Sequence, residues 1–210
     1  MENYYLKYEE QVKRSNRDRL LLHACCCPCS SHCIEVLADH FDITVFFYNP
    51  NIMPKEEYEH RKEESRRHAQ RYGLEWIEGT YEPQRWLELI EEEEQKSGKD
   101  LKHERERGNR CELCFEIRLR ASFKVARERG IDYVATTLAS SRWKDITQVN
   151  RAGEKIEQEE ADGQKKINFW SRNWRKGGLQ ERRNELLKEG QYYNQQYCGC
   201  PYSLRKEERG

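Results

Sequence analysis

Four short apolar runs mark the predicted strands of this chain. Residues 19–24 contain Leu20, Leu21 and Leu22 in succession, and an uninterrupted run of this kind is typical of a strand buried on both faces. Three later runs have the same character. The predicted strands cover residues 19–24, 43–48, 74–77 and 133–138.

Apolar residues at helical spacing separate and follow these runs. After the first run, Ile34, Leu37 and Phe41 recur at intervals of three or four residues, which places them on one face of a helix. Pro54 suits the first turn of the next helix, and Gly73 suits its end. The predicted helices cover residues 30–41, 54–72, 82–95, 111–129, 146–160 and 179–189.

This alternation predicts an α/β fold. Strands that alternate with helices are joined by right-handed crossovers, and they form a doubly wound, mainly parallel sheet flanked by helices. We expect residues 1–18 to form an N-terminal arm and residues 19–210 a single α/β domain with a helical C-terminal extension. Ligands bind beyond the carboxyl ends of such strands. The loops at residues 25–29, 49–51 and 140–145 are therefore expected at one edge of the sheet.

Charge and hydropathy exclude several classes of protein. Lys and Arg number 38, as do Asp and Glu, so the formal net charge of zero excludes a uniformly basic surface of the histone kind. No apolar stretch approaches the ~20 residues that span a bilayer, and residues 1–5 contain no apolar signal-peptide core. We therefore expect a cytoplasmic protein that does not bind a membrane.

Glycine is absent where a nucleotide-binding loop requires it. The first glycine of the chain is Gly73, whereas a phosphate-binding loop after the first strand needs glycines within about the next ten residues. The sequence therefore disfavours ATP or dinucleotide binding in that loop, and it shows no signature of a bound nicotinamide or flavin. Electrons for a redox reaction would have to come from an external donor.

The nine cysteines carry most of the chemical information. Their number is odd, and a reducing compartment disfavours structural disulfides. They also fall into three clusters, which indicates metal binding better than it indicates isolated buried thiols. The first cluster contains Cys25, Cys26, Cys27, Cys29 and Cys33, the second Cys111 and Cys114, and the third Cys198 and Cys200.

Spacing sorts these thiols further. Cys111 and Cys114 are three residues apart at the start of a predicted helix, so they can share a metal, and Cys26 and Cys29 have the same spacing. Adjacent residues of an extended chain point in opposite directions, so Cys25 and Cys26 suit two different metal centres better than one. Cys27 and Cys33 are not needed as metal ligands in this division. Seven thiols then divide into four for a closed centre and three for a centre with an open position.

Three other interpretations remain open from the residues alone. One structural zinc with spare buried thiols uses only four cysteines. A zinc-stabilised nucleic-acid-binding module without catalysis would give colourless protein. A cytosolic thiol–disulfide enzyme would use Cys26 and Cys29, and it would leave the other two clusters unexplained.

The motifs together resemble those of the QueH-type epoxyqueuosine reductases, and they extend from residue 20 to residue 204. The chain departs from that pattern at Ser141-Arg142-Trp143, where the family usually has Ser-Pro before the lysine, and at Asn173-Trp174-Arg175, where Asp-Phe-Arg is usual. The matching motifs are His23-x-Cys25-Cys26-x-Pro28-Cys29-Ser30, Tyr48-Asn49-Pro50-Asn51-Ile52-x-Pro54, Glu57-Tyr58-x-x-Arg61, Arg110-Cys111-x-x-Cys114-Phe115-x-x-Arg118-Leu119, Lys144-Asp145, Arg175-Lys176-Gly177-Gly178 and Tyr197-Cys198-Gly199-Cys200-x-x-Ser203-Leu204.

The resemblance implies an oxidoreductase that removes the epoxide oxygen of epoxyqueuosine in the tRNA anticodon, without cobalamin. It implies a HUP-like fold, a [4Fe-4S] cluster and an additional mononuclear iron, which would make residues 19–210 a metal-binding catalytic domain. The implied partners are tRNA carrying epoxyqueuosine and a ferredoxin-like one-electron donor. The implied metal ligands are Cys25, Cys26, Cys29, Cys111, Cys114, Cys198 and Cys200, and all of these except Cys29 are the implied cofactor-binding residues. Some family members have Asp at the position of Cys29.

Several further residues are candidates for the site. His23 and Asp145 are predicted catalytic residues, although His23 also suits a structural hydrogen bond and Asp145 the start of a helix. Asn49 and Asn51 are predicted to bind the substrate, with a plain turn as the alternative. Residues 164–183 combine a local charge excess with Phe169, Trp170 and Trp174, which predicts RNA binding through Arg175 and Lys176 unless these aromatic rings pack on the core.

Overall fold

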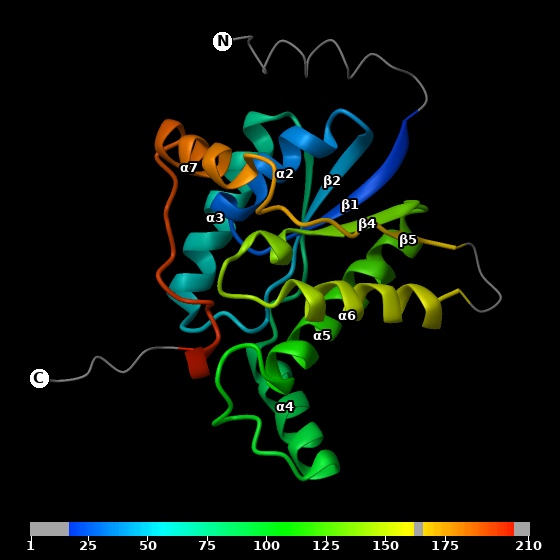
Figure 1. Cartoon of the computed structure of the whole chain (residues 1–210), viewed down its shortest axis with the longest axis vertical. Helices are drawn as coiled ribbons and strands as arrows, with labels where there is room; N and C mark the ends of the chain where they lie inside the picture. The colour runs from blue at the N-terminus through cyan, green and yellow to red at the C-terminus, as the bar shows by residue number, and fades with distance from the viewer. Residues whose placement is uncertain (1–16, 162–165, 204–210) are drawn as a thin grey trace, which may run out of the picture.

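The computed structural model describes residues 17–161 and 166–203, and these residues build one five-stranded sheet (Figure 1). Every pair of neighbouring strands is parallel, and the strand order is β3-β2-β1-β4-β5. The α/β class expected from the alternation of strands and helices is confirmed. The strands are β1 (Asp18–Ala24), β2 (Phe41–Phe47), β3 (Glu75–Glu78), β4 (Tyr133–Thr136) and β5 (Asn168–Phe169).

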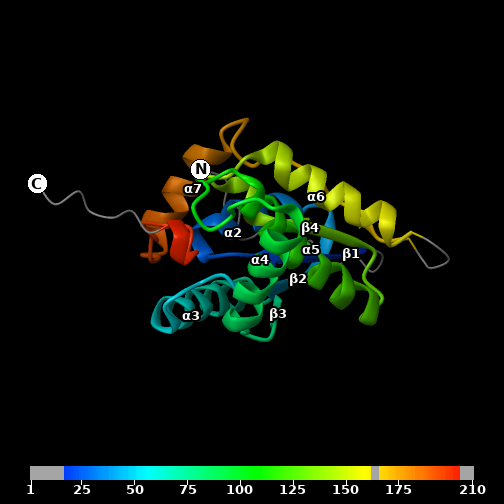
Figure 2. The same cartoon turned by 90° about the horizontal axis from the view of Figure 1, so that it is seen from below.

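Six α-helices flank this sheet in the described residues. Figures 1 and 2 show α2, α3 and α7 on one side of the strands and α5 and α6 on the other, while α4 extends away from the sheet. No helix in this part of the chain has the length and apolar content needed to cross a membrane. The helices are α2 (Cys27–Leu37), α3 (Lys55–Arg71), α4 (Pro83–Ser97), α5 (Asn109–Glu128), α6 (Ile146–Glu159) and α7 (Leu179–Glu189).

Strand β1 occupies the centre of the sheet, where the order of the strands reverses. Its residues Leu20, Leu21 and Leu22 are completely buried, as their unbroken apolar run predicts. Ala24 pairs with Phe47 and His23 pairs with Thr136, so β1, β2 and β4 end at nearly the same level. The three loops that follow these strands therefore lie at one edge, as expected.

The element boundaries differ from the predicted ones for local reasons. Helix α2 begins at Cys27 because Pro28, whose backbone lacks an N–H donor, suits the first turn, and this places Cys29 inside the helix. The predicted fourth strand ends at Thr136, since a short 3₁₀ helix occupies residues 137–140. Asp18 pairs with Phe41, so it belongs to β1 and not to the predicted arm. The two-residue strand β5 is too short for a periodic pattern.

Helix α7 is anchored to α2 by an ion pair. Arg182 donates from Nε and Nη2 to the two carboxylate oxygens of Glu35, at 2.9 and 2.8 Å. Such a bidentate contact fixes the relative orientation of the two side chains as well as the distance between them. The segment after α7 then runs along the outside of α3 and returns to the edge where the strands end (Figure 1). The fold thus brings the third cysteine cluster to the same edge as the first.

Candidate metal centre

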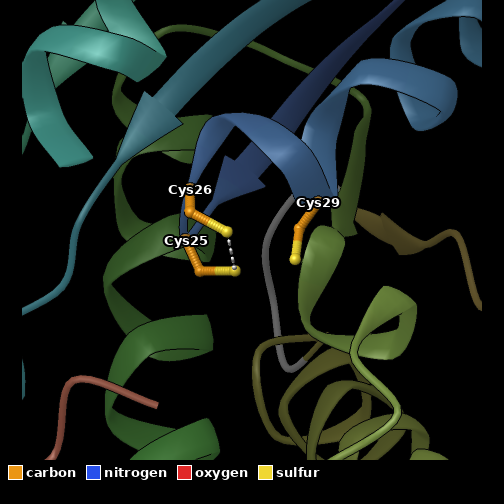
Figure 3. A group of neighbouring side chains, drawn as sticks. All are labelled: Cys25, Cys26 and Cys29. Atoms are coloured by element: carbon orange, nitrogen blue, oxygen red, sulfur yellow. Dashed lines mark hydrogen bonds between the residues drawn. The ribbon is translucent and has the colours of Figure 1, made fainter. Parts of the chain in front are cut away.

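The first thiol group lies where β1 passes into α2. The sulfur atoms of Cys25, Cys26 and Cys29 all lie within 4.8 Å of one another, and the Sγ atoms of Cys25 and Cys26 are 3.7 Å apart. Figure 3 shows the three sulfur atoms gathered in one space. All three residues are buried. This group is able to bind a metal.

The side chains of Cys25 and Cys26 do not point in opposite directions, as alternation along a strand led us to expect, and their assignment to two different centres stays a prediction. Alternation of side chains holds within a regular strand, but β1 ends at Ala24. Cys26 is the N-cap residue of α2, and the turn between strand and helix directs both neighbouring thiols toward the same space. The predicted proximity of Cys26 and Cys29 is confirmed.

The second thiol group combines distant parts of the chain. Cys111 and Cys114 at the start of α5 line one narrow cavity together with Cys198 and Cys200 from the C-terminal segment. Cys198 also lines a larger cavity, which contains Cys25. Cys198 therefore lies between the two thiol groups.

The backbone around Cys198 is held by three hydrogen-bonding contacts. The guanidinium of Arg61 donates to the carbonyl oxygens of Cys198 and Tyr197, at 3.1 and 3.0 Å. The N–H of Met53 donates to the carbonyl of Gly199 at 2.9 Å. Gly199 has a φ of 99°, and a Cβ there would lie 2.7 Å from Cγ1 of Ile52. Only glycine fits this position without strain.

Buried positive charge surrounds the thiols. Lys144 and Arg118 are 9% and 1% exposed, and in the described residues neither forms an ion pair with a carboxylate. Burial alone would lower the pKa of Lys144, but anionic sulfur at Cys198 and Cys25 outweighs burial and raises it. A buried cation requires an anion nearby. Thiolate sulfur is the anion that this site offers.

The surroundings of the thiols shift their pKa values in two directions. The pKa of Cys25 is held well below its ordinary value because the neighbouring thiols of Cys26 and Cys29 donate to it, and because Lys144 lies close. Burial raises the pKa of Cys111 to about 11 and that of Cys200 to about 12. A metal that binds Cys111 and Cys200 would displace protons from these two thiols. Clustered, buried thiolates among cations are the donor set that zinc and iron–sulfur centres use.

His23 lies beneath this site, enclosed by hydrogen bonds. Its Nε2–H donates to the carbonyl of Tyr48 at 3.0 Å, and its Nδ1 accepts from the Thr136 hydroxyl at 2.8 Å. Burial and the charge of Arg118 lower the pKa of His23 to about 3. Both ring nitrogens are therefore engaged in connecting β1 to its neighbours. This geometry supports the structural alternative, and the catalytic role of His23 stays a prediction.

Asp145 is the N-cap of α6. Its Oδ1 accepts from the backbone N–H groups of Thr147 and Gln148, at 2.8 and 3.3 Å. This contact is the helix start that the sequence left open as an alternative. Lys144 lines both cavities, whereas Asp145 lines neither. Its predicted catalytic role is not tested by this arrangement.

The predicted substrate-binding asparagines lie inside the protein. Asn49 donates to the carbonyl of Ala24 at 3.0 Å and accepts from Arg118, so it fixes the end of β1 and a buried cation. Asn51 is 1% exposed, and its amide makes no hydrogen bond within the described residues. Neither residue lines the cavities at the thiol groups. Their contact with substrate stays a prediction.

The residues of the predicted RNA-binding segment 164–183 lie in several different environments. Its residues 164 and 165 lie outside the described residues, and Arg175 and Lys176 occupy the turn before α7, away from both cavities. Trp174 is 1% exposed and donates from Nε1 to the carbonyl of Thr136 at 3.0 Å. Trp170 packs edge-on against Phe41. Trp174 is enclosed in the core, and Phe169 and Trp170 are half-buried against it, so the geometry supports the alternative that these rings pack on the core.

The larger cavity has a volume of about 660 Å³, which suits a small-molecule or nucleoside ligand. Its lining includes Cys25, Cys29 and Cys198. Arg61, Trp143 and Lys144 of its walls stand in or beside the motifs named above, whereas Asn194 and Gln195 are isolated polar residues that carry no spacing signal. The walls include Arg61, Trp143, Lys144, Arg183, Asn194 and Gln195.

A parallel α/β sheet with a thiol-lined cavity, and with a thiol group able to bind a metal, at the point where the strand order reverses is typical of an α/β enzyme that binds its ligand there. Residues 20–206 match the family model described as epoxyqueuosine reductase QueH. The chain therefore belongs to the QueH family of epoxyqueuosine reductases, and it is an oxidoreductase of queuosine biosynthesis.

Relatives from three organisms support this membership. The epoxyqueuosine reductase QueH of Histophilus somni is 40% identical over 189 residues, which cover 90% of this chain and 73% of the relative. The QueH protein of Acinetobacter baylyi is 39% identical, with 92% and 84% covered. That of Thermotoga maritima is 34% identical, with 88% and 90% covered. The resemblance described from the motifs is confirmed.

The close fit at Gly199 leads to a prediction about metal retention. Gly199→Ala should cost about 1–2 kcal/mol through its backbone conformation and should also displace Cys198 and Cys200, because the new methyl group meets Ile52. Gly98→Ala is the matched control, since Gly98 has a φ of 68° but open space around it. The measurement is bound metal per chain after identical anaerobic loading, together with the melting temperature.

Both variants should melt earlier, but only Gly199→Ala should lose metal. Equal metal content in the two variants would show that the backbone at Gly199 does not position the thiols.

Proposed function

We propose that this chain removes the epoxide oxygen of epoxyqueuosine in a tRNA anticodon, using iron held by its cysteines. The observation that carries the proposal is the position of Cys198, which lines both the narrow cavity of the second thiol group and the larger cavity. A substrate in the larger cavity would lie directly beside the metal-binding thiols. Membership of the QueH family supports the same reaction.

The reaction balances with two electrons and two protons. Both carbon–oxygen bonds of the epoxide break, the two carbons form a double bond, and the oxygen leaves as water. When bound, an iron–sulfur cluster and a neighbouring iron supply single electrons and Lewis acidity. No glycine-rich loop for a nicotinamide or flavin follows β1. We therefore infer an external one-electron donor of the ferredoxin type.

The thiols divide between two centres in this proposal. Cys111, Cys114, Cys198 and Cys200 provide four ligands, which suits a [4Fe-4S] cluster. Cys25, Cys26 and Cys29 provide three ligands, which suits a mononuclear iron with an open position. Asp in place of Cys29 would be compatible with this second role, because a carboxylate also binds iron.

The basic side chains around these centres have two roles in this proposal. Lys144 and Arg118 are buried beside the thiols, where they balance the negative charge of the metal-bound sulfur. Arg142 and Arg183 line the larger cavity, where they suit the phosphates of an RNA strand. Arg175 and Lys176 of the basic segment stay proposed contacts to tRNA farther from the cavity. We further infer a HUP-like variant of the doubly wound fold and a cytoplasmic location, where thiols remain reduced.

Metal analysis tests the cofactor directly. Anaerobically purified protein should be brown and should contain about four to five irons per chain with acid-labile sulfide. Cys111→Ser and Cys198→Ser should lose iron, because each substitution removes a ligand. Cys27→Ser and Cys33→Ser are matched controls: both residues are buried in α2, yet neither lines a cavity, and Cys33 donates to the carbonyl of Cys29.

The controls should keep most of their iron. Active protein with stoichiometric zinc and no sulfide would instead support a zinc enzyme, and the cofactor assignment would fail.

Nucleoside analysis tests the reaction. Reduced, iron-loaded protein should convert epoxyqueuosine-containing tRNA to queuosine-containing tRNA without ATP or cobalamin, as measured by mass spectrometry of digested tRNA.

Binding of tRNA should weaken with rising salt concentration, because cationic side chains of the protein contact the phosphates. Arg183→Glu should weaken tRNA binding about tenfold or more, because it reverses a charge at the cavity.

Arg85→Glu is the control, since Arg85 lies on α4 and half of its side chain is exposed. An epoxide left intact by iron-loaded, reduced protein would reject the proposed reaction.

A further inference from the structure

One large apolar side chain of the described residues is exposed, and it lies at the rim of the site. Trp143 is 41% exposed, whereas Trp86 and Trp174 are 1% exposed. It belongs to the loop between the 3₁₀ helix at residues 137–140 and α6. Trp143 lines the larger cavity and also the narrow cavity of the second thiol group. An exposed indole at a cavity rim is suited to contact with a ligand.

A cation extends the surface of this indole. The guanidinium carbon of Arg142 lies 4.7 Å from the ring centroid of Trp143. Arg142 lines the larger cavity as well. A guanidinium beside an indole combines two flat groups with one positive charge, and both kinds of group stack on nucleobases.

The loop that carries the pair is fixed by Arg107. The side chain of Arg107 donates to the carbonyl oxygens of Arg142 and Trp143, at 2.8 and 3.3 Å. Its own carbonyl accepts from Nε2 of Gln148 at 2.8 Å, and its backbone N–H donates to Sγ of Cys111 at 3.3 Å. Arg107 has a φ of 71°, a left-handed conformation that a side chain rarely adopts. The backbone that carries the indole is therefore held in place, and the same residue contacts a thiol of the second group.

The remainder of the larger cavity differs in character from this rim. It is lined by side-chain amides from α7 and from the segment after it, including Gln180, Asn184 and Asn194, together with Arg183. Amides hydrogen-bond to the edges of bases, and arginine binds phosphate. An aromatic rim beside a polar interior matches a single-stranded nucleic acid better than it matches a protein surface.

We propose that Trp143 and Arg142 form a stacking platform for an unpaired base of the tRNA anticodon loop that neighbours the reacting nucleoside. This inference rests on the proposed function, because that function provides the RNA. Trp143 acts as a positioning residue: it holds the loop so that the reacting nucleoside enters the cavity. The stacked base replaces water on the exposed part of the indole.

A fluorescence experiment tests the platform separately from catalysis. Iron-loaded protein is titrated with synthetic anticodon stem-loops that carry 2-aminopurine at each loop position in turn, because stacking on an aromatic ring quenches this base. Trp143→Ala should raise the dissociation constant roughly five- to 150-fold, as expected for the loss of one stacked base. It should also abolish the quenching at one loop position. Trp143→Phe should retain that quenching and bind within about threefold of the unmodified chain.

Arg66→Ala is the control for a lost surface charge, since Arg66 lies on the exposed side of α3, and it should change binding by less than about twofold. Unchanged binding and quenching in Trp143→Ala would overturn the platform. A second outcome would also overturn the platform. In that outcome Trp143→Ala binds RNA normally, and a protein donor reduces this variant slowly whereas a chemical reductant does not. The indole would then be assigned to docking of the electron donor. If the unmodified chain binds and quenches but leaves the epoxide intact, the platform stands and the proposed reaction fails.

Discussion

The structure depends on the balance between the positive charge of buried Lys and Arg side chains and the negative charge of clustered cysteine sulfur. Lys144 and Arg118 are enclosed at the edge of the sheet, and their charges face thiols and not carboxylates in the described residues. Burying a cation without an anion costs several kcal/mol, so this edge is stable only when sulfur carries negative charge. Metal binding supplies that condition because it removes the protons from the thiols.

Much of the fold could be predicted because its signal is local. The buried run at Leu20–Leu22 and the parallel direction of the strands follow from periodicity and from the geometry of crossovers. The cysteine spacing also identified thiols that the fold brings together, among them Cys26 and Cys29. Strand β5 was missed because two residues carry no periodicity, and its existence depends on pairing with β4.

The arrangement of the site could be predicted only in part, because it depends on contacts between distant segments. The direction of the Cys25 side chain is set by the turn into α2, and no alternation rule covers that turn. Trp174 and Trp143 look alike as sequence signals, yet one completes the core behind β4 and the other lies at the cavity rim. Arg61 looks like an ordinary surface residue of a charged helix, but it holds the backbone at Cys198.

The most direct test of the charge balance is iron retention after a timed challenge with a chelator, measured in the unmodified chain and in two variants at position 144. Lys144→Arg keeps the buried charge, and Lys144→Gln removes it. We expect Lys144→Arg to retain its iron nearly as well as the unmodified chain, and Lys144→Gln to lose most of it, because the anionic centre then lacks one of the buried cations that face it. Equal retention in all three proteins would contradict the account.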